Sequence, residues 1–142
     1  MENARQLNRD RRGLATVEMA ILLPLLLLVI LAILEYGWCF LKYQCVNSAT
    51  REGVRVAVRE GATDAQWQTA VTNVMAGCGK AGVVPTYTRT LTPGVGAASG
   101  TELTCRVTVP YAQLNITSWA LFPLPTNLVA VATMAKEGPI TP

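Results

Sequence analysis

The sequence predicts an α+β fold in which one long N-terminal helix carries a short second helix and a small antiparallel sheet of about three strands. Two observations lead to this prediction. An apolar run over residues 19–34 is followed by residues that keep helical spacing as far as residue 60. Further along, residues 101–111 alternate strictly between apolar and polar side chains, which is the pattern of a strand with one buried face.

The apolar run predicts a membrane-spanning helix, which we place at residues 14–35. Residues 14–34 are about 21 residues and rise about 31 Å as a helix, which matches the hydrocarbon thickness of a bilayer. Residues 14–34 contain one ionisable residue, Glu18. An unpaired carboxylate costs about 3 kcal/mol at the bilayer centre, so we expect a compensating charge. Pro24 cannot donate to the carbonyl of Ala20, and it is either a bend with a role in assembly or an ordinary membrane proline.

A basic leader, residues 1–13, precedes the span, and its charge predicts a cytoplasmic N-terminus and a translocated C-terminal part. Cleavage after Gly13 would give Leu14 a new α-amine one helical turn from Glu18. The amine and the carboxylate could then neutralise each other within one chain or across two staggered chains. The alternatives are a plain topology signal without cleavage, and a secretory signal peptide, which needs a shorter apolar region and a cut site of small residues.

The leader, the glycine, the glutamate at the fifth position after it and the apolar helix together resemble the class III signal of type IV prepilins and pseudopilins. More closely, residues 11–57 resemble the TadE family of the tight-adherence (Tad) pilus system. The resemblance rests on Arg-Arg-Gly-Leu-Ala-Thr-Val-Glu at 11–18, Pro-Leu-Leu-Leu-Leu at 24–28, Glu-Tyr-Gly at 35–37 and Ala-Thr-Arg-Glu-Gly-Val-Arg at 49–55. Met19 departs from that family, which usually has an aromatic residue after the glutamate.

The resemblance implies a minor pilin or pseudopilin that a prepilin peptidase cuts between Gly13 and Leu14. It implies a role for Glu18 and Pro24 in assembly, and as partners the other pilin and pseudopilin subunits and the pilus platform proteins. The protein would reside in the bacterial inner membrane with a periplasmic C-terminus, or outside the cell in an assembled pilus used in surface adhesion and biofilm formation. Two alternatives are an uncleaved single-pass envelope protein displaying a small partner-binding domain, and a pseudopilin of a type II secretion machine.

Residues 36–142 are expected to form a pilin-like outer domain, with a helical spine at 36–60 and a globular part at 61–142. The spine begins with an aromatic belt typical of a membrane interface and continues with a stripe of small side chains suited to close packing. Gly61 should end it. The belt consists of Tyr36, Trp38, Phe40 and Tyr43, and the stripe of Val46, Ala49, Gly53 and Val56. Arg51, Arg55 and Arg59 predict a solvated face, with Glu52 and Glu60 as partners in this or a neighbouring subunit.

A short helix should begin at Thr63 or Asp64 and stop at Gly77. Strands are expected at residues 83–91, 101–111 and 128–135, separated by a turn-rich loop and by an irregular segment at 114–125. The last strand has small or apolar residues on both faces, which predicts that it is central or covered on both sides.

Four cysteines are expected to have different roles. Cys78 and Cys105 would both be translocated, and a disulfide between them would close a loop of about 27 residues, worth roughly 3.5 kcal/mol in the chain-entropy model. Cys39 and Cys45 lie six residues apart on a helix, point to opposite sides and cannot pair within one chain. They are either buried small apolar residues or contacts between subunits.

The composition gives little support for catalysis or for nucleic-acid binding. The chain has no histidine, which removes the usual general base and the commonest metal ligand. The sequence contains no phosphate-binding glycine loop and no Cys-x-x-Cys pair. The net charge of +3 comes without a basic surface interleaved with aromatic residues. We therefore expect no enzyme activity, no cofactor, no metal and no nucleic-acid partner.

Overall fold

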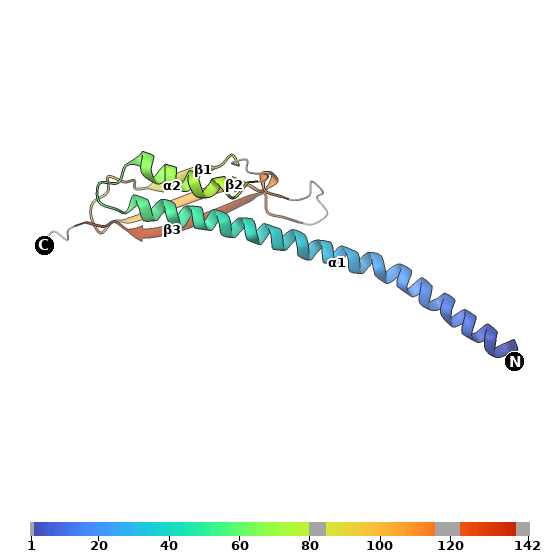
Figure 1. Cartoon of the computed structure of the whole chain (residues 1–142). Coiled ribbons are helices and arrows are strands. Elements are labelled where there is room, and N and C mark those ends of the chain that lie inside the picture. The colour runs from blue at the N-terminus through green and yellow to red at the C-terminus, as the bar shows by residue number, and fades with distance from the viewer. Residues whose placement is uncertain (1, 80–84, 116–122, 139–142) are drawn as a thin grey trace. The chain divides into compact units, whose positions relative to one another are not determined.

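The computed structural model describes residues 2–79, 85–115 and 123–138, with the backbone alone for residues 2–15. The chain divides into two units, Met1–Tyr36 and Gly37–Pro142. One helix, α1 (Glu2–Ala57), contributes to both units (Figure 1). The predicted α+β class is confirmed, since a long helix, a short helix and a three-stranded antiparallel sheet follow one another.

The first unit consists of α1 as far as Tyr36, with Pro24 inside the helix. Its large apolar side chains from Val17 to Leu34 are exposed, at 44% or more of their surface. The helix is long and apolar enough to cross a membrane. The helix extends further toward the N-terminus than predicted, because the leader residues from Glu2 are helical as well.

At its other end α1 stops at Ala57, three residues before the predicted end. The N–H of Arg59 donates to the carbonyl of Val56 at 3.4 Å, an i to i−3 bond that tightens the last turn and takes it out of α geometry. Gly61 follows with a φ of 71°. Glycine reaches this left-handed conformation without steric cost, but the helix has already ended before the predicted stop at Gly61.

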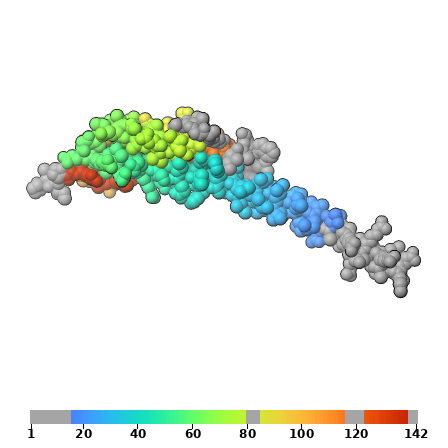
Figure 2. All heavy atoms as spheres, viewed as in Figure 1, coloured from blue at the N-terminus to red at the C-terminus, as the bar shows by residue number. Residues whose placement is uncertain are grey.

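The second helix, α2 (Asp64–Ala76), has Thr63 as its N-cap and Gly77 as its C-cap, as predicted. The N–H of Thr63 donates to Oε1 of Gln66 at 3.0 Å, which satisfies a backbone donor at the helix start. Three residues spaced by four, Trp67, Val71 and Met75, are buried. In the space-filling view α2 lies directly against the outer part of α1 (Figure 2).

The sheet has the order β1-β2-β3, with both neighbouring pairs antiparallel. Its strands are β1 (Thr88–Thr92), β2 (Glu102–Pro110) and β3 (Asn127–Ala135), and a 3₁₀ turn, η1 (Tyr111–Gln113), follows β2. The expected strand 101–111 matches β2 closely. The expected strand 83–91 is shorter at its start, since residues 85–87 are not in a strand and residues 83 and 84 lie outside the described residues.

The prediction that the last strand is central or covered on both sides is wrong. In a three-stranded meander the second strand is the central one, so β3 lies at the edge. Its inward residues Leu128 and Ala130 are buried, whereas Val129 and Val131 on the outward face remain 39% and 48% exposed. Apolar residues on both faces of this strand therefore do not mean burial within the chain.

The core of the second unit lies between the inward face of the sheet and the two helices. The predicted small-residue stripe faces this core: Val46, Ala49 and Gly53 are buried and Val56 is half-buried. A Cβ at Gly53 would overlap the side chain of Val71 and lie 3.5 Å from the sulfur of Cys105. The absence of a side chain at position 53 therefore lets α1, α2 and β2 meet at one point.

Candidate membrane anchor and assembly surface

The predicted leader junction lies within the helical backbone of α1. Gly13 and Leu14 are both helical, and Glu18 is one turn further along. The side chain of Glu18 is exposed within the single chain. Residues four apart lie on one helix face, so an amine on Leu14 would be on the same side as this carboxylate. The cleavage itself and the assembly role of Glu18 stay predictions.

Pro24 lies in the middle of the apolar part of α1, and the helix continues through it. The proline ring has no N–H, so the carbonyl of Ala20 loses its helical donor. This carbonyl is available to a donor from another helix, which is compatible with the predicted role of Pro24 in assembly and also with an ordinary membrane proline.

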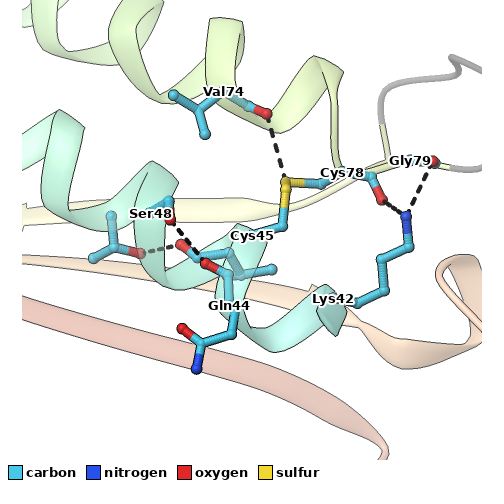
Figure 3. Close-up of a disulfide and its surroundings, with 9 residues drawn as sticks. Lys42, Gln44, Cys45, Ser48, Val74, Cys78 and Gly79 are labelled. Carbon is cyan, nitrogen blue, oxygen red and sulfur yellow. Dashed lines mark hydrogen bonds between the residues drawn. A yellow bond between two sulfur atoms is a disulfide. The ribbon is translucent and has the colours of Figure 1, made fainter. Parts of the chain in front are cut away.

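The predicted disulfide between Cys78 and Cys105 is wrong, because Cys78 is bonded to Cys45, with the two Cα atoms 5.7 Å apart (Figure 3). The expectation that Cys45 is an unpaired small residue or a contact between subunits is wrong with it. Cys39 and Cys105 take no part in this bridge. Cys105 instead fills the core beneath Gly53, and its burial raises the pKa of the thiol from 9.0 to about 11.

A signal for the observed bridge was present in the sequence. Cys45 precedes Ala49 by four residues and so extends the small-residue stripe that faces the core. Two helices joined by a short reversal run antiparallel, so residues equally far from the turn lie level with each other. Cys45 lies 12 residues before the end of α1 and Cys78 lies 14 residues after the start of α2, which brings them together.

Lys42 reinforces this junction, and sequence reasoning missed it. Its ammonium is buried and donates to the carbonyls of Cys78 at 2.6 Å and Gly79 at 3.4 Å (Figure 3). It also lies 4.6 Å from the centre of the Trp38 ring, close enough for a cation–π interaction. The indole N–H of Trp38 donates to the carbonyl of Leu114 at 2.6 Å. Trp38 therefore helps to hold the second unit together, whereas Phe40 and Tyr43 of the predicted belt are exposed.

Arg51, Arg55 and Arg59 are exposed, as predicted, although α1 ends before Arg59. Arg55 makes a bidentate ion pair with Glu52, with both N···O distances at 3.0 Å. This hydrogen-bonded carboxylate raises the pKa of Arg55. Arg51 and Arg59 are also exposed. The pair with Glu52 confirms one of the two predicted acidic partners within the same chain.

A second lysine, Lys136, binds the C-terminal end of α1. The ammonium of Lys136, just after β3, donates to the carbonyls of Ala57 at 3.2 Å, Arg59 at 3.0 Å and Val95 at 2.9 Å. A positive charge at a helix C-terminus also interacts favourably with the helix dipole. The N–H of Glu137 donates to the carbonyl of Val58, so the chain after β3 is fixed to the end of α1.

The residues described with side chains contain no group of three or more His, Cys, Asp or Glu residues that could hold a metal ion. The first unit presents an apolar helix surface. The second unit is a cross-linked domain with an exposed sheet face and an open sheet edge.

Residues 13–55 match the model of a protein family described as TadE-like protein. The match starts at Gly13 and ends at Arg55, so it includes Glu18, the apolar run and most of the outer half of α1, but less than half of the 142 residues. The predicted resemblance to the TadE family is confirmed over this segment. No curated protein and no solved structure matches the chain significantly.

Proposed function

We propose that this chain, TadE-like over residues 13–55, is a minor pilin or pseudopilin of a Tad-type pilus that a prepilin peptidase cuts after Gly13. The observation that carries the proposal is the start of the family match at Gly13, with Glu18 and a candidate membrane helix directly after it. The partners are the inner membrane, the peptidase, other pilin and pseudopilin subunits and the pilus platform proteins.

The exposed apolar side chains of residues 17–34 support this proposal. A surface of this kind requires apolar surroundings, first the lipid and then the spans of other subunits. Exchange of lipid for other apolar helices is nearly neutral in hydrophobic terms, so packing and polar contacts decide which helices associate. Glu18, paired with the α-amine of a neighbouring processed chain, supplies such a polar contact.

Charge and cysteine chemistry support the proposed orientation. Arginines of the leader favour a cytoplasmic N-terminus. The Cys45–Cys78 disulfide is typical of an oxidising compartment, which fits a periplasmic second unit or one exposed on a pilus. In this role the protein works in surface adhesion and biofilm formation.

Processing is tested by the intact mass of the protein isolated from its native membranes. We expect a chain that begins at Leu14, lighter than the full sequence by residues 1–13. A chain that keeps its original N-terminus would contradict the proposal and favour an uncleaved single-pass envelope protein.

The role of Glu18 is tested by Glu18→Ala, with Glu60→Ala as a matched control on the exposed end of the second unit. We expect Glu18→Ala to insert into the membrane normally but to be lost from sheared pili, because the neighbouring amine has no carboxylate to meet. Glu60→Ala should be incorporated like the wild type. Immunoblots of the sheared and membrane fractions measure both, and normal incorporation of Glu18→Ala would refute the role.

A further inference from the structure

The exposed side of α1 remains apolar beyond residue 35, where the predicted span ends. Phe40, Leu41 and Tyr43 are exposed at 63%, 56% and 38% of their surface. The predicted end depends on the charge of Glu35, but this side chain is only 6% exposed. A buried carboxylate does not show what surrounds the exposed side of the helix. Adjoining apolar side chains that stay exposed usually mark a contact with lipid or with another protein.

The opposite side of this part of α1 packs inside the second unit. The indole N–H of Trp38 donates to the carbonyl of Leu114 at 2.6 Å. The buried ammonium of Lys42 donates to the carbonyl of Cys78 at 2.6 Å. Trp38 and Lys42 are four residues apart and therefore share one side of the helix. Only the other side can meet lipid, so the depth of α1 in a bilayer has to be judged from that side.

The exposed side becomes polar from Gln44 onward. Its next side chains are spaced by four, three and four residues, which keeps them on one helix face. These exposed residues are Gln44, Ser48, Arg51 and Arg55. The change from apolar to polar on the exposed side therefore falls between residues 43 and 44.

Helix geometry relates this change to the layers of a bilayer, because α1 is continuous through these residues. The hydrocarbon is about 30 Å thick and the whole bilayer about 40–45 Å, so each headgroup layer is about 5–7 Å thick. At about 1.5 Å per residue, a hydrocarbon layer ending at Leu34 would leave Leu41 about 10 Å beyond it, in water. A layer ending at Gly37 would put Leu41 about 6 Å beyond it, among the headgroups. Gln44 would then be about 10 Å beyond it and in water.

We propose that Phe40, Leu41 and Tyr43 contact the headgroup layer of the lipid bilayer, and that the hydrocarbon surrounds residues 18–37 rather than 14–34. About 20 helical residues rise about 30 Å, which equals the hydrocarbon thickness. Lipid is the occupant because these side chains continue the exposed apolar surface of residues 19–34 along the same helix. The inference rests on the proposed function only in that α1 crosses a membrane, and it depends on neither cleavage nor assembly.

This depth places Glu18 at the inner boundary of the hydrocarbon instead of inside it. A side chain at the boundary can extend its carboxylate into the headgroup layer, whereas a carboxylate deep in the hydrocarbon requires a partner. The chain is then stable in the membrane without an amine that neutralises Glu18. Pairing with the amine of a neighbouring chain becomes necessary only when the helix leaves the lipid.

The test measures the depth of single positions in the full-length chain with Cys39→Ser. Each chain carries one new cysteine on an exposed position of α1, labelled with a small fluorophore. The four variants are Val17→Cys, Leu27→Cys, Leu41→Cys and Ser48→Cys. Ser48 is the matched control for Leu41, since it lies two turns further along the same face. The chain with Cys39→Ser alone should take no label, because Cys45 and Cys78 are bonded and Cys105 is buried.

The labelled chains are reconstituted in phosphatidylcholine vesicles. The quenchers are lipids with a spin label on the headgroup, lipids with a spin label in the middle of the acyl chain, and iodide on both sides of the membrane. We expect the headgroup label to quench the fluorophore at position 41 at least threefold more than at position 48, and iodide to show the reverse order. At position 17 the headgroup label should quench more strongly than the acyl-chain label.

Three outcomes would overturn the proposal. Equal quenching at positions 41 and 48 would place Leu41 in water. Protection of position 41 from all three quenchers would show that a second copy or another protein covers it. Stronger quenching by the acyl-chain label at position 17 would place Glu18 inside the hydrocarbon. Retention of the Cys45–Cys78 bridge shows that each variant is folded.

Position 27 separates this inference from the proposed function. Strong quenching there by the acyl-chain label supports a membrane span at either depth. Its absence would contradict the span, and with it both the proposed function and this inference. A failure confined to positions 17 and 41 would overturn the depth proposed here and leave the proposed function intact.

Discussion

The two halves of α1 bury their apolar side chains against different surroundings. Residues 19–34 are apolar on all sides, and their large side chains remain exposed within the chain. Residues 37–57 have a narrow stripe of small side chains that packs on α2 and the sheet, and a polar face with arginines and a glutamate. One continuous helix thus has a half that requires lipid or other helices and a half that has its own protein partner.

This difference shows how sequence separates membrane anchorage from domain packing. In the first half the side chains are large, and Glu18 is the residue that we propose gives specificity. In the second half the side chains are small, and the specificity comes from Gly53, from the Cys45–Cys78 disulfide and from Lys42. Changes at matched positions of the two halves should therefore have different consequences.

The largest effect is expected from removing the Cys45–Cys78 disulfide, which lies within the second unit. The bridge joins residues 33 apart, and the chain-entropy model gives it about 4 kcal/mol. The double variant Cys45→Ser/Cys78→Ser should lose stability of that order and still insert into the membrane. Guanidinium unfolding of the full chain in detergent, followed by tryptophan fluorescence, measures it. The control Cys39→Ser removes a cysteine outside the bridge, and an equal loss in it would contradict this assignment.

The next effect concerns the candidate membrane span in the first half of α1. Leu27→Arg places a charge near the middle of the span, at a cost of about 3 kcal/mol at the bilayer centre. Ser48→Arg places the same charge on the exposed face of the second half. We expect the first variant to reduce the fraction of protein resistant to carbonate extraction, and the second to leave it unchanged. Similar extraction of both variants would show that residues 16–34 do not span the membrane.

A smaller effect is expected at the glycines. Gly53→Ala adds a methyl group that overlaps the side chain of Val71, and such overpacking typically costs about 1–3 kcal/mol. Gly37→Ala has nothing within 4 Å of the new Cβ and should be neutral or slightly stabilising in a helix. Gly53→Ala should therefore lower the unfolding midpoint, whereas Gly37→Ala should leave it unchanged or raise it slightly. A midpoint of Gly53→Ala at or above that of Gly37→Ala would contradict the packing at position 53.

The smallest effect is a pH dependence of the second unit. Burial raises the pKa of Cys105 from 9.0 to about 11, so between these values the unfolded chain releases a proton that the folded chain keeps. The contribution of this thiol to stability is full below pH 9 and is lost as the pH rises toward 11. Unfolding midpoints measured from pH 8 to 11 should fall more steeply in the wild type than in Cys105→Ala. Identical slopes would show that Cys105 does not titrate in this way.

Much of the fold was predictable because it depends on local patterns. The span follows from an apolar run, the start of α2 from Thr63, and β2 from strict alternation. The position of β3 was not predictable in the same way, since an apolar edge strand and a central strand have the same composition. The TadE-like segment was recognisable from Gly13, Glu18 and the residues around Arg55, whereas no local pattern specifies the chemistry of residues 56–142.

The disulfide partner was missed for a different reason. Pairing depends on which residues the helix reversal brings level, and Cys105 was the more attractive partner on the clearest strand. Lys42 was missed because its partners are backbone carbonyls. Every residue has such a carbonyl, so these bonds produce no recognisable sequence pattern.

The disulfide between Cys45 and Cys78 can also report on which side of the membrane the second unit lies. Chains whose second unit never left the cytoplasm should keep all four thiols and take up four copies of a thiol-specific mass tag. Translocated chains, in which Cys45 and Cys78 are bonded to each other, should take up two fewer. A single gel of denatured, alkylated protein would then give the translocated fraction without any fusion partner.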